Sequence, residues 1–283
     1  MKTAIVTDTN SNLSIQEAKD LGVYLIPMPF FIDGATYLEG KDCTPEMFFR
    51  KMKEGAEVST SQPSPEEITS LWERLLETYD AVLHFPMSSG LSGSCEMAKA
   101  LSQEYGGRVL VVDDHRIAVT LAQSIYNAKV LLEQGKTAAE VRDILEREKS
   151  ASSVYIAVNT LEYLKKSGRV TAAGAAMAAI LHIKPVLQIQ GGKLDAYKKV
   201  RGMLQAKKTL IEALRHDLAT RFAGMKMAVF SGYSGSDPTL GEAWQKEVQA
   251  AFPNHSVGLI SLPLSICCHT GEGALGVACA KMW

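Results

Sequence analysis

The sequence lacks the features typical of nucleic-acid-binding, membrane-spanning and secreted proteins. Its 30 lysines and arginines almost balance its 31 aspartates and glutamates, and a net charge of −1 argues against general nucleic-acid binding. No uninterrupted apolar run is long enough to span a bilayer. The chain starts directly with a strand-like segment at residues 3–7, without a signal-peptide pattern. We therefore expect a cytoplasmic protein.

Cysteine is also scarce, and its pattern does not indicate a disulfide framework. The odd number of cysteines favours reduced thiols. Cys267-Cys268-His269 suggests a metal site, but zinc sites usually space their cysteines about two to four residues apart and need a second ligand pair, which we do not find. We expect small core cysteines, with no metal and no cofactor. The five residues are Cys43, Cys95, Cys267, Cys268 and Cys279.

The common phosphate-binding motifs are missing or misplaced. No G-x-x-x-x-G-K-[ST] sequence occurs, which excludes a P-loop with that signature. Residues 271–276 match G-x-G-x-x-G, but a dinucleotide fold needs this pattern early in a βαβ unit, and only seven residues follow Gly276. We interpret this match as a coincidence.

A serine hydrolase is the alternative function that the residues leave open. The segment 90–94 is similar to a nucleophile elbow but has Ser94 where the last glycine is required. Ser92, His269 and either Asp8 or Asp113 could still form a triad in space.

Strand-like and helical segments alternate along the chain, which predicts an α/β fold with mostly parallel or mixed sheets. Ser14, Thr44, Ser64 and Thr137 are placed to cap helices, and Gly135 to end one. Asp33-Gly34 is typical of a hairpin turn, so some strands should pair antiparallel. The expected strands are residues 4–7, 24–31, 81–85, 109–112, 154–158, 185–189, 227–230 and 257–262.

The length of 283 residues suits one large or two smaller domains. A long helical stretch from about residue 115 to 149 ends near Ala151-Ser152. We therefore divide the chain into an N-terminal α/β subdomain, residues 1–152, and a C-terminal α/β subdomain, residues 153–283.

Two loops rich in hydroxyl groups and a late histidine are the strongest candidates for a ligand site. The loops are residues 59–65 and 88–94, and the histidine is His269. Small residues let backbone N–H groups approach a ligand, and hydroxyl groups can donate and accept hydrogen bonds. Both loops also precede expected helix starts, which favour anions. This combination indicates a site for a small anionic group.

Acidic residues that follow apolar strands have two interpretations. Asp8, Asp113 and Asp114 could line a ligand crevice at the carboxyl ends of strands. Asp113 and Asp114 could instead cap a helix near His115, which we favour. His84 and His182 are expected to be packed and hydrogen-bonded.

Residues 161–215 carry eleven lysines and arginines against three acids, so their net charge is +8 while the rest of the chain sums to −9. This segment is either a solvated helix face or a basic surface that meets an acidic partner or a phosphate.

Taken together and in this order, these segments resemble the DegV family of fatty-acid-binding proteins over nearly the whole chain. The resemblance implies two α/β subdomains with a ligand tunnel between or within them. The matching segments are residues 5–8, 60–65, 88–93, 161–170, 183–187, 192–194, 201–202 and 269–276.

The resemblance further implies a carrier with no activity of its own, which binds one long-chain fatty acid and presents it to a separate fatty acid kinase subunit that makes acyl-phosphate. Thr60, Ser92 and His269 would hold the carboxylate, with Ser61 and the Gly93 backbone close by. Arg169 and Arg201 would suit kinase docking. Residues 172–181 would line the tunnel or belong to the core. No membrane span is implied, and contact with a membrane surface would be transient.

The chain departs from the family pattern at three places. Asp114 replaces the serine of Val-Asp-Ser, Ser167 replaces a glycine of Lys-Lys-Gly-Gly-Arg, and Glu272 replaces the proline of Gly-Pro-Gly-Ala-Leu-Gly. An acid that pointed toward the head group would disfavour an anion. We expect Glu272 to point to solvent.

Overall fold

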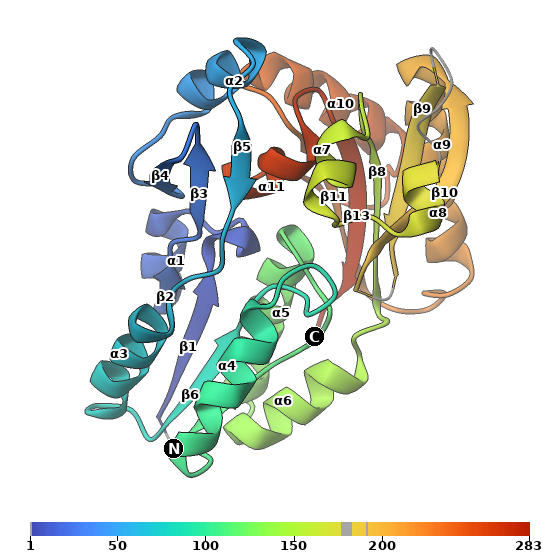
Figure 1. Ribbon diagram of the computed structural model, residues 1–283. Coiled ribbons are helices and arrows are strands. Elements are labelled where there is room, and N and C mark those ends of the chain that lie inside the picture. The colour runs from blue at the N-terminus through green and yellow to red at the C-terminus, as the bar shows by residue number, and fades with distance from the viewer. Residues whose placement is uncertain (1, 177–182, 191) are drawn as a thin grey trace.

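The computed structural model describes residues 2–176, 183–190 and 192–283. Within these residues the strands form a four-stranded, a three-stranded and a six-stranded sheet, with helices packed around them (Figure 1). Parallel and mixed sheets occur together with alternating helices, so the predicted α/β class is confirmed. None of the helices in the described part of the chain has both the length and the apolar character required to cross a bilayer.

The four-stranded sheet is entirely parallel and is covered on both faces, as parallel sheets usually are. Alternate residues face opposite sides: Ile5 and Leu83 join the core under helices α5 and α6, whereas Val6 and Val82 join the core under α3 and α4. The strand order is β2 (Val23–Ile26), β1 (Thr3–Asp8), β6 (Ala81–Phe85) and β7 (Val109–Val111).

Four helices of this half begin at the caps that the sequence predicts. Ser14, Ser64 and Thr137 each form a capping box, and the Thr44 hydroxyl accepts the N–H of Met47. These elements are the 3-10 turn η1 (Thr9–Ser11), α1 (Ile15–Leu21), α2 (Pro45–Lys53), α3 (Pro65–Leu76), α4 (Ser94–Ser102), the 3-10 turn η2 (Gln103–Tyr105), α5 (Val119–Glu133) and α6 (Ala138–Arg147).

The three-stranded sheet lies in the N-terminal part of the chain and packs against a helix from the C-terminal part. Its strands β4 (Ala35–Leu38), β3 (Pro29–Ile32) and β5 (Val58–Thr60) pair antiparallel. The turn Asp33-Gly34 has positive φ at both residues, +49° and +79°, so the predicted hairpin is confirmed. Helix α11 (Leu264–Thr270) packs on this sheet through Leu264, Cys267 and Cys268.

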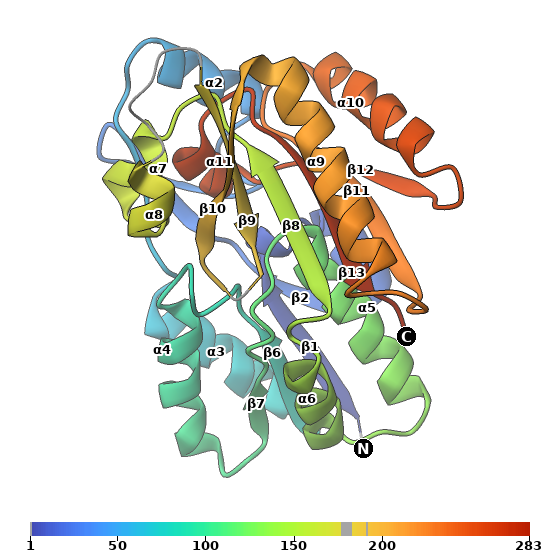
Figure 2. The ribbon, with the colours of Figure 1, turned by 90° about the vertical axis from the view of Figure 1, so that its right-hand side faces the viewer.

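The six-stranded sheet is mixed rather than parallel. Its order is β10 (Leu194–Arg201), β9 (Ile183–Ile189), β8 (Ser152–Ala157), β13 (Leu275–Lys281), β11 (Met227–Tyr233) and β12 (Val257–Ser261), and only the β11–β12 pair of the described strands is parallel. Helices α9 (Gly202–Ala219) and α10 (Pro238–Ala251) pack on one face (Figure 2). The short helices α7 (Glu162–Ser167) and α8 (Ala172–Ala175) follow β8 in the chain and precede β9.

The sequence-based strand assignment is wrong in two respects. The expected strand 24–31 is two strands, β2 and β3, which belong to different sheets and are separated by Pro27 and Met28. In addition, no strand is predicted from the sequence at β4, β5, β10 or β13. β5 is very short, β10 is a polar edge strand, and β13 is rich in glycine and alanine, so none shows a strong strand pattern.

Buried His84 on β6 should make the protein sensitive to acid. Its ring packs edge-on against Trp72, with ring centroids 5.4 Å apart, and burial lowers the pKa of His84 to about 3. In the unfolded chain the pKa of histidine returns to about 6.5. Between pH 7 and pH 5 only the unfolded state therefore gains a proton at this position, which lowers the free energy of unfolding by about 2 kcal/mol.

We expect His84→Phe to remove this contribution while keeping an aromatic ring against Trp72. Urea unfolding at pH 7 and pH 5 should show that the wild type loses about 2 kcal/mol more than the variant. Asp8 and His269 also change protonation on unfolding in this pH range. Because both residues are present in both proteins, their contributions to the free energy of unfolding cancel in the comparison. Equal losses for the two proteins would show that His84 is not the responsible group.

Candidate functional site

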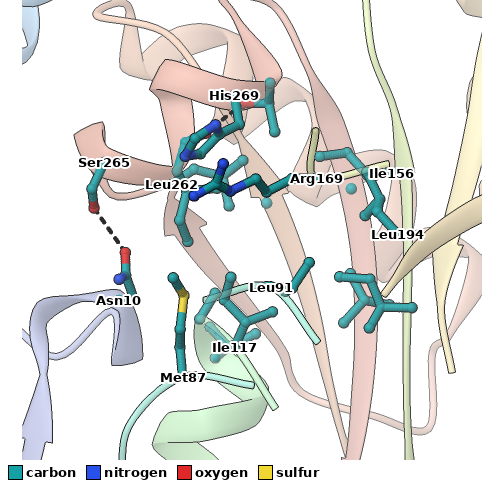
Figure 3. A pocket seen from close by; sticks show the side chains of 18 of the residues that line it. Asn10, Met87, Leu91, Ile117, Ile156, Arg169, Leu194, Leu262, Ser265 and His269 are labelled. Atoms are coloured by element: carbon teal, nitrogen blue, oxygen red, sulfur yellow. Dashed lines mark hydrogen bonds between the residues drawn. The ribbon is translucent and has the colours of Figure 1, made fainter. Parts of the chain in front are cut away.

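A cavity lies between the carboxyl ends of the parallel strands and the open face of the six-stranded sheet (Figure 3). It encloses about 1200 Å³ of space free of protein atoms, part of it open to solvent. Met87 follows β6, and Ile117 follows β7, so the crevice lies at the strand ends where ligand sites in α/β sheets are expected. Residues from both expected subdomains line it.

The floor of the cavity is an apolar sheet surface with little side-chain bulk at its centre. Paired residues on neighbouring strands form two rows across the sheet, and the small residues Gly232, Gly276 and Ala278 occupy the middle. The larger side chains at the ends of the rows form low walls. The rows are Ile189–Val154–Ala278–Phe230 and Ile156–Gly276–Gly232–Ile260, and all eight residues line the cavity.

The polar end of the cavity brings Thr60 and His269 together. Thr60 is the last residue of β5 and His269 lies near the end of α11, and these elements pack against each other. The Thr60 hydroxyl is hydrogen-bonded to Nε2 of His269 at 3.0 Å. Ser61 and Gln62 continue the same wall. Two residues that are 209 positions apart in the sequence therefore form one polar unit.

Ser92 and Gly93 reach the same cavity from the loop before α4. Ser88 fixes this loop: its hydroxyl donates to the Gly192 carbonyl at 3.0 Å and accepts the N–H of Gly90 at 3.2 Å. Gly90 packs so closely on Gly192 that a Cβ at position 90 would lie 2.4 Å from the Gly192 carbonyl oxygen. Ser92 is thus presented by a loop whose backbone has little freedom.

His269 is neutral at physiological pH. Burial, and secondarily the positive charge of Arg169, lower the pKa of His269 to about 4. A neutral imidazole has one N–H and each hydroxyl one O–H, and the Thr60–His269 hydrogen bond uses one of these protons. The remaining donors, including the Ser92 hydroxyl, can donate to an oxygen of a ligand. The end of the cavity can therefore solvate a small oxyanion by hydrogen bonds.

The catalytic triad of the hydrolase alternative is not assembled. Nδ1 of His269 has no hydrogen-bond partner among the described residues, and its Nε2 is bonded to Thr60 rather than Ser92. The Asp8 carboxylate accepts the N–H groups of Asn10 and Met87. The Asp113 carboxylate pairs with Lys99 at 2.8 Å. Among the residues that the structure describes, no carboxylate therefore orients the imidazole.

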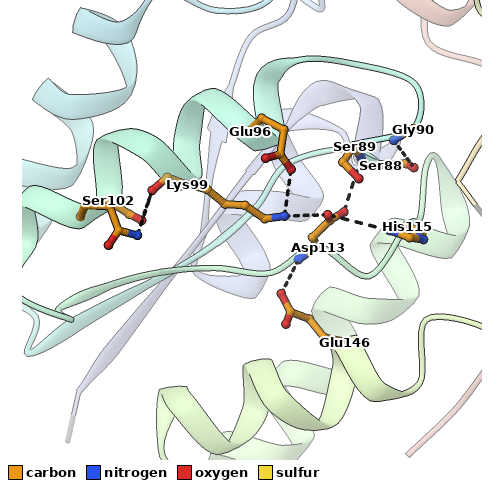
Figure 4. Close-up of polar contacts among 10 residues, drawn as sticks. Ser88, Ser89, Gly90, Glu96, Lys99, Ser102, Asp113, His115 and Glu146 are labelled. Carbon is orange, nitrogen blue, oxygen red and sulfur yellow. Dashed lines mark hydrogen bonds and ion pairs between the residues drawn. The ribbon is translucent and has the colours of Figure 1, made fainter.

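The predicted helix caps at Asp113 and Asp114 are wrong. Helix α5 begins only at Val119, after His115 and Ala118 with positive φ, and no side chain caps it. Asp113 instead pairs with Lys99 and accepts the N–H of Ser89 (Figure 4). The buried Asp114 carboxylate accepts the Ser124 hydroxyl and the Arg116 N–H. Asp113 therefore connects the Ser88 loop to α4.

Glu39 is a positioning residue that the sequence analysis misses. Its carboxylate accepts the N–H groups of Leu264 at 2.9 Å and of Ser265 at 2.7 Å, the first two residues of α11. Anionic oxygens stabilise helix N-termini in this way. Because α11 carries His269, Glu39 helps to fix the imidazole. No local pattern relates residues 225 positions apart.

The remaining candidates are distributed as follows. Arg169 lines the cavity, whereas Arg201, at the end of β10, is not among the described lining residues. Glu272 pairs with Lys53 at 3.0 Å and lies outside the cavity lining.

The G-x-G-x-x-G match falls between a helix and a strand, in the reverse order to a dinucleotide fold. Of the expected lining 172–181, residues 172–176 do not line the cavity; residues 177–181 and His182 lie outside the described residues.

The expected core cysteines are found. Cys95, Cys267, Cys268 and Cys279 are buried, and Cys43 is half-buried. Cys267 and Cys268 pack in the core between α11 and the three-stranded sheet. Burial raises the pKa of both thiols, so these groups are protonated at neutral pH.

The chain is similar to known proteins over its whole length. A family model described as "Uncharacterised protein, DegV family" matches residues 2–282. A DegV domain-containing protein of Deinococcus radiodurans is 32% identical, with 98% of each chain covered.

Two solved structures extend this likeness to the fold. A DegV family protein from Thermus thermophilus, described as fatty acid binding, is 32% identical with a TM-score of 0.90 and full coverage of both chains. A Thermotoga maritima protein, said to reveal fatty acid binding function, is 28% identical with a TM-score of 0.80, again over both complete chains. The chain belongs to the DegV family.

Proposed function

We propose that this protein binds one long-chain fatty acid, with the acyl tail along the apolar floor and the carboxylate at Thr60, Ser92 and His269. The observation that carries this proposal is a cavity that combines an apolar sheet surface with a hydrogen-bonding end formed by Thr60, Ser92 and the neutral imidazole of His269. Ser61 and the Gly93 backbone adjoin the head group. The fatty acid binding described for the Thermus thermophilus and Thermotoga maritima proteins supports the same ligand class.

The two ends of the site would contribute differently to binding. Burying a methylene group is worth about 0.8 kcal/mol, so a tail of about fourteen methylenes contributes on the order of 11 kcal/mol before ordering and association costs. A buried carboxylate costs several kcal/mol unless its oxygens accept hydrogen bonds. The tail would thus set affinity, and the Thr60, Ser92 and His269 group would set orientation.

The proposal extends to a carrier role, in which a separate fatty acid kinase subunit phosphorylates the bound carboxylate. Two features support this: the cavity is partly open to solvent, and the basic segment 161–215 includes the exposed Arg201. An acidic surface on the kinase would complement this segment.

Charge reversal at Arg201 tests the carrier role. Arg201→Glu should slow acyl-phosphate formation with the kinase by about tenfold, because attraction at the docking surface becomes repulsion. Fatty acid binding by the isolated variant should be unchanged, since Arg201 does not line the cavity. Loss of both properties, or of neither, would count against docking through this residue.

Native mass spectrometry of protein purified gently from bacteria tests the binding itself. We expect a co-purified mass that corresponds to one long-chain acid. Delipidated protein should gain about 2.7 kcal/mol of apparent stability when free palmitate reaches about one hundred times its dissociation constant. A ligand-free spectrum combined with no thermal shift on addition of palmitate or oleate would refute the proposal.

A further inference from the structure

One row of the cavity floor ends in a phenylalanine followed by a glycine. From Ala278 on β13 the row continues to Phe230 on β11 and then to Gly258 on β12, which lies at the edge of the sheet (Figure 2). Phe230 lines the cavity, whereas Gly258 is not among the described lining residues. A large ring therefore lies between the open centre of the floor and a position without a side chain.

The Phe230 ring is turned toward Gly258 and away from the centre of the floor. A Cβ at position 258 would lie 2.7 Å from Cδ1 of this ring and 3.2 Å from Cε1. Carbon atoms in contact are about 3.5–4.0 Å apart, so the ring occupies the space that a side chain at position 258 would need. Because Gly258 has no side chain, the ring can lie over β12 and leave the space above Ala278 open.

We propose that Phe230 is the distal wall of the acyl site and that Gly258 sets the length of the acyl chain that fits, by determining where this ring lies. The inference rests on the proposed fatty acid binding and adds a limit on chain length to it. Gly258 would act only through Phe230, so it is a positioning residue for the wall.

The course of the chain places Phe230 at the distal part of the tail. Helix α11 carries His269 and leads through residues 271–274 into β13, where Gly276 precedes Ala278. Two residues advance a strand by about 7 Å. Since Phe230 is paired with Ala278, a tail that starts at His269 reaches Gly276 first and the Phe230 ring later. The ring therefore meets the tail rather than the carboxylate.

The Phe230 ring can change its position more easily than a core side chain. Phe230 is half-buried and belongs to none of the hydrophobic core clusters that the described residues form. Close packing holds core side chains in one rotamer, whereas a ring outside the core can move between staggered positions. A methyl group at position 258 would displace the ring from β12, and the cavity above Ala278 is the space open to it.

The alternative is that Phe230 and Gly258 only stabilise the sheet. An aromatic ring that covers a glycine on an edge strand compensates for the missing side chain. Stabilisation alone predicts that a substitution of Gly258 lowers the free energy of unfolding and leaves the relative affinities for short and long acids unchanged. A length limit predicts that this affinity ratio changes.

The test compares octanoate with palmitate in the wild type, Gly258→Ala, Phe230→Ala and the double variant. Dissociation constants are measured by displacement of a fluorescent fatty acid. Gly258 has no positive φ, so alanine fits its backbone. Gly258→Ala should weaken palmitate binding by about tenfold relative to octanoate, as expected if the ring displaces about two methylenes.

Gly235→Ala is the matched control, because a Cβ at position 235 would lie 4.0 Å from its nearest neighbour and Gly235 does not line the cavity. This variant should keep the wild-type ratio. In the double variant the methyl group at position 258 meets no ring, so its ratio of octanoate to palmitate affinity should equal that of Phe230→Ala.

Phe230→Ala tests the wall independently of Gly258. Removal of the ring should raise the affinity for stearate relative to palmitate by up to about tenfold, because two further methylenes gain space. An unchanged ratio of stearate to palmitate affinity would show that Phe230 does not limit the chain.

Two further results would overturn the inference while the proposed function survives. Equal or absent effects of Gly258→Ala on octanoate and palmitate would limit the contact between Gly258 and Phe230 to sheet stability. A full Gly258→Ala effect that persists without the ring would show that Gly258 does not act through Phe230. If the wild type binds none of these acids, the proposed function itself fails, and the length limit fails with it.

Discussion

Ala278→Phe is expected to abolish binding of long-chain fatty acids and leave the fold intact. Ala278 lies on the cavity face of β13, between Val154 on β8 and Phe230 on β11. A phenyl ring at this position would occupy the central space that the small residues of the floor leave open. If the ring displaces only four methylenes, the loss at about 0.8 kcal/mol each already corresponds to more than a hundredfold in affinity.

The loss should also depend on chain length, because only acids long enough to reach the ring are affected. Isothermal titration with octanoate, laurate and palmitate measures this dependence. Ala219→Phe provides the matched control, since Ala219 is exposed at the end of α9. Palmitate binding by Ala278→Phe at wild-type affinity, in a protein that unfolds cooperatively, would show that the tail does not cross this part of the sheet.

His269→Ala should weaken binding of every fatty acid by about a hundredfold, irrespective of chain length. The substitution removes the imidazole donor and leaves the Thr60 hydroxyl without its partner at 3.0 Å. A buried carboxylate that loses a hydrogen bond forfeits about 2–3 kcal/mol, more than a neutral acceptor would. His269→Ala should therefore reduce the affinity for all chain lengths equally, whereas the affinity loss of Ala278→Phe should increase with the length of the acyl tail.

Thr60→Val and His255→Ala complete this experiment. Thr60→Val keeps the side-chain shape and should reproduce most of the defect of His269→Ala. His255 does not line the cavity, so His255→Ala should bind like the wild type. A His269→Ala variant that retains fatty acids normally would remove His269 from the head-group site, whatever its effect on stability.

Local chemistry explains which parts of the fold the sequence predicts. Caps such as Ser14 and Ser64 bond to backbone groups within three residues, and the Asp33-Gly34 turn needs only its own positive φ angles. The hydroxyl loops were recognisable for the same reason, because small and polar residues follow one another in the chain. Short-range signals of this kind do not depend on the rest of the fold.

The parts that were missed depend on distant partners. β13 has a weak strand pattern, yet β8 and β11 enclose it on both sides. The helix caps expected at Asp113 and Asp114 fail because Lys99, Ser124 and Arg116 compete for these carboxylates. The support of α11 by Glu39 and the position of Arg169 beside His269 likewise arise only when remote segments meet. The division into residues 1–152 and 153–283 remains a prediction.

A crystal structure of the protein grown with palmitate would show directly whether and how the cavity binds a fatty acid. We predict continuous tubular density for one palmitate molecule, with its carboxylate within hydrogen-bond distance of Thr60, Ser92 and His269 and its tail over Ala278 and Gly276. Density in the opposite orientation, with the carboxylate away from these three residues, would contradict the head-group assignment. A cavity that stays empty at saturating palmitate would contradict fatty acid binding at this site.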